Sequence, residues 1–135
     1  MIHVASPLSL EQELVVSEVI GAAIAVHRGL GPGYLESIYR RAMCAELSAR
    51  GIGFDTEWAV DVVYRGALIG THRIDLIVEK LVVVELKAVE RLEPVHRRQV
   101  VSYLKSSKLC IGLLINFDVD VLKQGLRRIV LSKPA

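Results

Sequence analysis

Apolar side chains recur at helical spacing in three stretches of the chain. The first stretch begins with Ser9-Leu10-Glu11-Gln12, which has the form of a capping box, and it ends at the glycine-rich run Gly29–Gly33. The second runs from about Tyr34 to Arg50 and stops at Gly51, a residue type that suits a left-handed helix end. The third begins at Pro94, a residue favoured at the first helical position, and runs to about Ser107. The pattern predicts three helices.

Other stretches alternate apolar and polar residues or are apolar throughout, and we expect these to be strands. They are Trp58–Tyr64, Leu68–Val78, the run that ends at Lys87, Leu109–Asn116 and Arg127–Leu131. The nearly continuous apolar run before Asn116 is typical of a strand buried on both faces beside a parallel neighbour. The third helix precedes it, which predicts a right-handed strand, helix, strand crossover. A turn at Arg65-Gly66 and a short turn or helix near Asp118–Gly125 complete the path, and the last strand is expected at an edge.

Two runs rich in Ile, Val and Leu flank Glu79-Lys80 and predict a β-hairpin. If the turn centres on Lys80, Asp75 lies opposite Glu85 and Arg73 lies opposite Lys87. Side chains alternate between the faces of a strand, so each face of the hairpin collects every second residue. One face carries Arg73, Asp75, Ile77, Val83, Glu85 and Lys87. The other carries Ile74, Leu76, Val78, Val82, Val84 and Leu86, is wholly apolar and must be buried.

The charged face of this hairpin is a candidate site. Directly opposed residues of an antiparallel pair have Cβ atoms roughly 5 Å apart, so Asp75 and Glu85 need a positive charge between them. Carboxylate oxygens at this spacing suit Mg²⁺, and Lys87 adds a fixed positive charge for phosphate oxygens. The alternative is a solvated sheet face on which the charges form an ordinary ladder. Ile77 and Val83 on the same face favour a cleft over open surface.

Polar residues on two of the predicted helices are further candidates. Glu36 and Tyr39 share a face of the second helix and can point together into a site, although the helix dipole alone also explains a carboxylate in the first turn. On the third helix His96, Gln99 and Tyr103 form one stripe. Such stripes usually face solvent, but neighbouring apolar residues allow this one to border a cleft. Arg97 and Arg98 flank the stripe.

Length and composition fit one globular domain over residues 1–135, with 52% hydrophobic and 24% charged residues. A net charge of +2 is no clear basic excess, but an acidic site subtracts from the count. Cys44 and Cys110 show no zinc or disulfide spacing and are expected to be buried small hydrophobes. No signal peptide is apparent, and the most apolar helical run, Val19–Val26, is too short to span a membrane. We therefore expect a cytoplasmic protein without membrane contact.

Several motifs together resemble a known family. Asp75 followed by Glu85-Leu86-Lys87 resembles the PD-(D/E)XK nuclease superfamily, and Gly33–Tyr39 is similar to the signature of its GxxExxY branch. Further agreement lies in Gly31-Pro32-Gly33, Arg73-Ile74-Asp75, Gln99 with Tyr103-Leu104, and Leu113–Phe117. The similarity covers roughly Ser9 to Val130. Ile74 stands where the superfamily name places a proline.

This resemblance implies a restriction-endonuclease-like α/β fold, in which helices flank a mixed central β-sheet. It implies that Asp75 and Glu85 hold Mg²⁺ or Mn²⁺ with the help of the Leu86 carbonyl, and that Glu36 supplies a further ligand directly or through water. Lys87 would then orient or activate the attacking water, and Gln99 would position Lys87 or a phosphate.

Other residues are expected to contact the substrate. Arg73, Arg97 and Arg98 are candidate phosphate contacts on charge alone. Tyr39 and Tyr103 are expected to lie beside the site as substrate contacts.

Two functions follow from the sequence. The first is a metal-dependent nuclease that hydrolyses phosphodiester bonds by in-line attack of water, acting on nucleic acid, with DNA favoured over RNA. The second is a module on the same fold that binds nucleic acid or protein without cleaving. Because one site cuts one strand, a double-strand break would require a homodimer.

Overall fold

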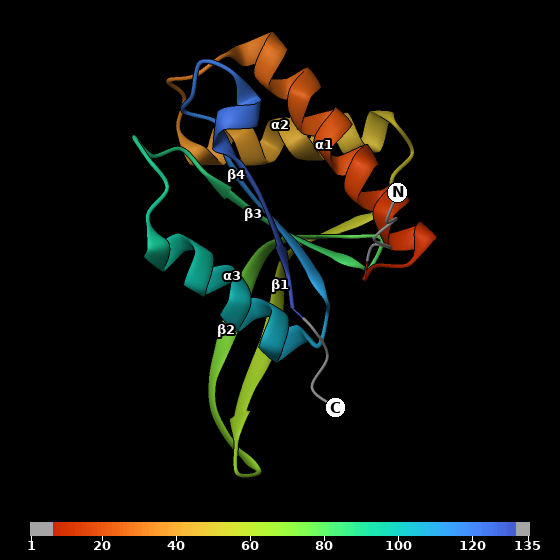
Figure 1. Ribbon diagram of the computed structural model, residues 1–135, viewed down its shortest axis with the longest axis vertical. Helices are drawn as coiled ribbons and strands as arrows, with labels where there is room; N and C mark the ends of the chain where they lie inside the picture. Colours follow the sequence, from red (N-terminus) through yellow and green to blue (C-terminus); the bar gives the residue numbers. More distant parts are fainter. Residues whose placement is uncertain (1–6, 132–135) are drawn as a thin grey trace, which may run out of the picture.

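The computed structural model describes residues 7–131, which form three helices, one short 3₁₀ helix and a five-stranded sheet (Figure 1). In chain order the elements are α1 (Leu10–Leu30), α2 (Glu36–Ala49), β1 (Phe54–Tyr64), β2 (Ala67–Val78), β3 (Val82–Lys87), α3 (Pro94–Ser107), β4 (Ile111–Asn116), η1 (Leu122–Gly125) and β5 (Leu126–Val130). All three predicted helices are present, and α3 has the predicted bounds. The largest difference among the strands is at β1, which begins at Phe54 instead of Trp58.

Local sequence signals determine where the helices begin and end. Ser9 caps α1 by accepting a hydrogen bond from the Gln12 N–H at 3.0 Å, while the Ser9 N–H donates to the Gln12 side-chain oxygen. Gly31 follows α1 with φ +70°, and Gly51 follows α2 with φ +71°, a conformation that strains other residues. The predicted capping box and both glycine stops are confirmed.

The strands are hydrogen-bonded in the order β1-β2-β3-β4-β5. Only β3 and β4 are parallel, and α3 connects them, as the predicted crossover requires. The three other neighbouring pairs are antiparallel, so the sheet is mixed, and β5 lies at an edge as predicted. The expected fold class, a mixed central sheet flanked by helices, is confirmed.

Each face of the sheet is covered by helices (Figure 1). On one face, α1 and α2 bury a large apolar cluster that includes Leu76, Val84 and Leu86. On the other face, α3 covers a smaller cluster with Ile77 and Val83. The predicted alternation therefore holds near the hairpin turn. Ile74 is an exception, because it is buried on the α3 face and not with Leu76.

The register of the β2–β3 hairpin is as predicted, but its ladder is short. The paired residues are Leu76 with Val84, Ile77 with Val83, and Val78 with Val82. The two strands separate on the side of Leu76 that lies away from the hairpin turn. The predicted pairs Asp75 with Glu85 and Arg73 with Lys87 are therefore not part of the backbone ladder. Arg73 lies instead opposite Ala59 of β1. This separation decides the geometry of the candidate site.

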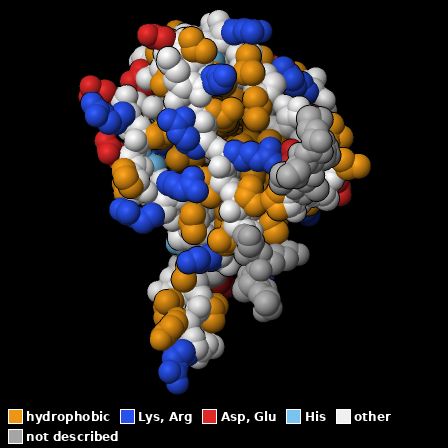
Figure 2. Space-filling model, in the orientation of Figure 1, with side chains coloured by type: hydrophobic (Ala, Val, Ile, Leu, Met, Phe, Trp, Pro, Cys, Tyr) orange, Lys and Arg blue, Asp and Glu red, His pale blue; other side chains and the backbone are white. Residues whose placement is uncertain are grey.

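The β1–β2 hairpin extends beyond the rest of the molecule as an arm (Figures 1 and 2). Arg65 and Gly66 form its two-residue turn with φ +51° and +80°, at the position predicted for a turn. Several large apolar side chains near this turn are exposed. They are Val63, Tyr64, Leu68 and Ile69.

The lengths of the helices and the burial of the two cysteines bear on two of the expectations from the sequence. Within residues 7–131 no helix is long and apolar enough to cross a bilayer. Cys44 and Cys110 are free thiols that are half-buried, and both pack against the cluster under α1 and α2. They therefore serve as partly buried apolar residues, less enclosed than expected.

Gly112 of β4 permits the close packing of α3, because a Cβ there would lie 2.6 Å from Val100 Cγ1. We expect Gly112→Ala to lower the free energy of unfolding by about 1–3 kcal/mol through overpacking, measured by urea denaturation. Gly70→Ala in β2 is the control, since its Cβ would meet nothing within 4 Å. Equal stability of Gly112→Ala and wild type would contradict this account of the packing.

Candidate active site

Asp75 lies where the backbone ladder of β2 is interrupted on both sides. On the β3 side, the backbone pairing of β2 ends at Leu76. On the β1 side, Asp75 and the residue across from it, Glu57, are not paired, although the residues on either side of them are. Glu57 has φ +48°, which breaks the regular strand there. Asp75 Oδ2 accepts a hydrogen bond from the Leu86 N–H at 3.0 Å. A side chain of β2 thus replaces the missing backbone contact with β3.

The same bond gives the direction of the Leu86 carbonyl. The N–H and C=O of one strand residue point to the same side of the strand. Lys87 C=O faces β4, where it accepts from the Phe117 N–H at 3.0 Å, so the groups of Leu86 face away from β4. The Leu86 carbonyl therefore points to the side on which Asp75 lies.

Glu85 is the central buried acid, with only 4% of its surface exposed. Its Oε2 lies 3.3 Å from Lys87 Nζ, whereas its Oε1 is buried with no hydrogen-bond partner in the described part of the chain. Burial, followed by the charge of Asp75, raises the pKa of Glu85 to about 8, although Lys87 acts in the opposite direction. A solvated charge ladder is excluded for this face.

Helix α2 contributes Glu36 and Arg40. Arg40 Nη1 lies 3.6 Å from Asp75 Oδ1, a contact that holds the second oxygen of that carboxylate. Burial and the negative charge of Asp75 raise the pKa of Glu36, and Lys87 and Arg40 lower it. Glu36 thus lies within the range of charge interaction with Asp75, and its role as a metal ligand stays a prediction. Sequence analysis missed Arg40, although its position four residues after Glu36 places both on one helix face.

Helix α3 contributes Gln99 and Tyr103 from the opposite layer. Gln99 Nε2 donates to Tyr103 Oη at 2.7 Å, so the contact observed for Gln99 is with Tyr103 and not with Lys87. Burial, then the charges of Glu85 and Asp75, raises the pKa of Tyr103 to about 12, which keeps the phenol a hydrogen-bond donor. Side chains from both helical layers reach the acids where β2 and β3 separate.

Tyr39 is a correction to the sequence analysis. Its side chain is fully buried and stacks on Phe117 with ring centroids 4.5 Å apart. Its hydroxyl donates to the Gly31 carbonyl at 2.6 Å and accepts from the Tyr34 N–H at 3.2 Å. A side chain with all its surface and its hydroxyl engaged is not available to a substrate. Tyr39 instead fixes the loop that leads into α2.

The three predicted phosphate contacts lie outside the buried cluster. Arg73 is exposed on β2, and Arg97 and Arg98 are exposed near the start of α3.

Sequence analysis also missed Asn116, a buried residue at the end of β4. Its side chain accepts from the Val89 N–H at 3.0 Å and donates to the Val89 carbonyl at 2.8 Å, which holds the segment after Lys87. The only sequence signal was one polar residue in an apolar strand.

The residues present fit a hard divalent cation. Asp75 and Glu85 supply carboxylate oxygens, Glu85 Oε1 is an unpaired buried oxygen, and the Leu86 carbonyl faces the same side. Within residues 7–131 no three His, Cys, Asp or Glu side chains converge as a ready set of metal ligands. Glu36 therefore does not join the two acids as a third direct ligand in this geometry.

The raised pKa of Glu85 predicts a pH dependence of stability. Between its ordinary value of 4.5 and about 8, the folded protein holds a proton that the unfolded chain releases. In metal-free buffer the free energy of unfolding should therefore fall as the pH rises through this range. Glu85→Gln should be more stable than wild type at pH 8, by on the order of a few kcal/mol, in urea denaturation.

Glu90→Gln, at an exposed position, is the control and should follow wild type. Identical pH profiles for Glu85→Gln and wild type would show that Glu85 ionises as an ordinary carboxyl group.

The family model described as the PD-(D/E)XK nuclease superfamily matches residues 13–129, which is most of the chain. This range contains Glu36, Asp75, Glu85 and Lys87, and it forms the mixed sheet with helices on both faces. No curated protein and no solved structure matches the sequence. The fold is restriction-endonuclease-like, and the chain belongs to the PD-(D/E)XK nuclease superfamily.

Proposed function

We propose that this protein is a metal-dependent nuclease that hydrolyses phosphodiester bonds by in-line attack of water. The observation that carries the proposal is the buried, unpaired Oε1 of Glu85, which lies beside Asp75 while Lys87 Nζ is 3.3 Å from the other oxygen. A buried carboxyl group beside a second acid, with one oxygen unpaired, is costly to the fold unless a ligand uses it. Membership of the nuclease superfamily supports the same chemistry.

Asp75, Glu85 and the Leu86 carbonyl would hold Mg²⁺ or Mn²⁺, and Glu36 would contribute through water. When bound, the ion lowers the pKa of a water molecule and stabilises charge on the phosphate. Arg40 fixes one oxygen of Asp75, and the Leu86 N–H fixes the other. These two contacts orient the carboxylate before the substrate arrives.

Lys87 holds the attacking water or a phosphate oxygen through its ammonium group, which Glu85 orients. Gln99 positions the Tyr103 hydroxyl, which donates a hydrogen bond toward the phosphate. Arg73, Arg97 and Arg98 lie further out and neutralise phosphates of the bound strand.

We assign the chain to the GxxExxY branch within the superfamily. Each residue of the motif has a distinct physical role in the structure, which supports the assignment: Gly33 has φ +103°, Glu36 lies at the site and Tyr39 lies in the core.

DNA is the expected substrate. Figure 2 shows Lys and Arg spread over the face in view with apolar side chains between them, a surface compatible with a phosphate backbone. Cleavage of both strands requires two copies of the chain.

Cleavage of a labelled panel of single- and double-stranded DNA and RNA in Mn²⁺, Mg²⁺ or EDTA tests the function. We expect metal-dependent cutting by wild type, and a loss of about 100-fold or more in kcat for Lys87→Ala, because charge on the phosphate is no longer stabilised. Lys105→Ala, an exposed residue of α3, should retain wild-type activity.

Unchanged cutting by Lys87→Ala would remove this residue from the mechanism. No cutting by wild type under any condition would favour a module that binds without cleaving.

Metal binding is tested without activity by thermal unfolding at pH 8. We expect Mg²⁺ or Mn²⁺ at about 100 times its Kd to stabilise wild type by about 2.7 kcal/mol, seen as a rise in Tm. Asp75→Asn should lose this rise because it weakens one ligand. Asp61→Asn, an exposed position on β1, should keep it. A metal-induced rise that survives in Asp75→Asn would place the ion elsewhere.

A further inference from the structure

A recess next to the acids is lined by Arg40, Arg41, Cys44, Thr56 and Glu57. The first three come from α2 and the last two from β1, so the recess lies between a helix and the edge strand of the sheet. Arg40 also contacts Asp75 Oδ1 at 3.6 Å. One guanidinium group is therefore shared between the recess and the proposed active site.

Backbone geometry links this recess to the catalytic acid. Glu57 has φ +48°, an uncommon conformation for a residue with a side chain, and it is the residue of β1 that lies across from the unpaired Asp75. The same irregularity therefore forms a wall of the recess and frees Asp75 from its ladder. The recess is therefore close to Asp75, because Arg40 both lines it and contacts this acid.

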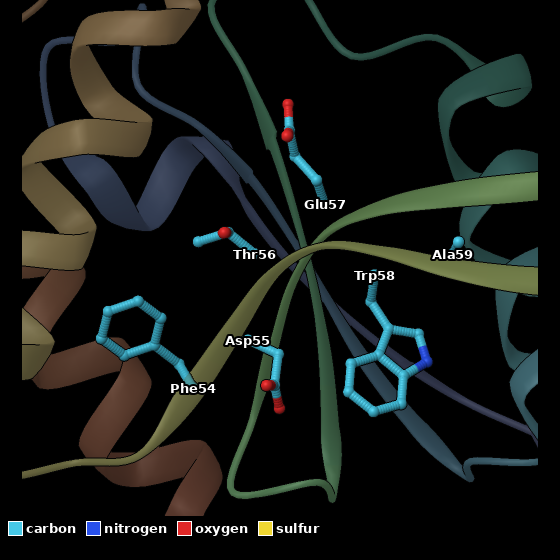
Figure 3. A pocket seen from close by; sticks show the side chains of 6 residues that line it. All are labelled: Phe54, Asp55, Thr56, Glu57, Trp58 and Ala59. Carbon is cyan, nitrogen blue, oxygen red and sulfur yellow. The ribbon is translucent and has the colours of Figure 1, made fainter.

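The recess also continues along the edge of the sheet. An open groove lined by Phe54–Ala59 shares Thr56 and Glu57 with it. Figure 3 shows Thr56 directed toward the layer of α1 and α2, and Trp58 directed away from Glu57. An extended ligand can therefore occupy the recess and continue along β1.

The charges in the recess favour an anion. Arg41 is exposed and forms no ion pair within residues 7–131, and the lining of the recess contains two arginines but a single carboxylate, Glu57. Arg40 also lines the recess, but Asp75 already engages its guanidinium group, so Arg41 is the cation of the lining left for an anion. Burial raises the pKa of the Cys44 thiol, which keeps it neutral beside an anion. Guanidinium groups bind phosphate oxygens in a bidentate manner.

We propose that this recess binds a phosphate of the nucleic-acid strand next to the scissile phosphate, with Arg41 as its main contact and Thr56 as a neutral donor. The inference rests on the proposed nuclease function and adds a binding position to it. Arg41 forms no hydrogen bond or ion pair with the acid cluster in the described structure, so its proposed role is in binding and not in the chemical step.

The test compares steady-state cleavage by wild type, Arg41→Ala and Arg41→Lys on an oligonucleotide that wild type cuts. We expect KM to rise about tenfold in Arg41→Ala with kcat within twofold, and Arg41→Lys to lie between, because it keeps the charge but loses bidentate bonding. The slope of log(kcat/KM) against log salt should become shallower by about one in Arg41→Ala. An oligonucleotide that lacks the neighbouring phosphate should abolish the difference from wild type.

Arg127→Ala is the matched control, because this exposed arginine lies on β5 at the opposite edge of the sheet. Circular dichroism and urea denaturation establish that each variant is folded. A wild-type KM and salt slope in Arg41→Ala would overturn the proposed phosphate-binding role of the recess and leave the proposed nuclease function intact. A fall in kcat at unchanged KM would have the same meaning. If the wild-type protein cleaves no nucleic acid, both the nuclease function and the phosphate-binding role of the recess are overturned before any Arg41 variant is measured.

Discussion

The hydrogen bond from the Leu86 N–H to Asp75 Oδ2 is the contact on which the candidate site depends. It forms because β2 leaves β3 after one short ladder, so that a side chain takes the place of a backbone carbonyl. This exchange turns Asp75 toward β3 and leaves the Leu86 carbonyl facing the same side. Without the separation of the strands, helices on opposite faces of the sheet would have no common point at which their side chains meet.

Electrostatic cost concentrates at this point. Glu85 is almost fully buried, one of its oxygens has no partner among the described residues, and burial together with the charge of Asp75 opposes its ionisation by raising its pKa. Lys87 and Arg40 offset part of the repulsion. A fold that needed only stability would place apolar side chains here, because a buried charge without a full set of partners is destabilising. The surrounding apolar clusters supply the stability that the site removes.

Much of the fold could be predicted from local patterns. Capping residues determined the start of α1, glycines determined where α1 and α2 end, and β-branched runs gave the strands and the hairpin register. The site was predicted less completely because its geometry is not periodic. The separation of β2 from β3, the reversed face of Ile74 and the distortion at Glu57 come from tertiary packing and leave no local signal.

The segment that enters α2 shows why motif residues need not share a role. Glu36 begins the helix and reaches the acids, whereas Tyr39 lies one turn later, where the helix packs on Phe117. The Tyr39 hydroxyl binds the Gly31 carbonyl, so this buried phenol holds the loop that precedes Glu36. Spacing alone placed both residues on one face, but burial differs along that face because α2 begins at the edge of the core and its later residues are buried in it. Tyr39 therefore anchors the loop on which Glu36 follows, whereas Glu36 itself interacts with the charge of Asp75.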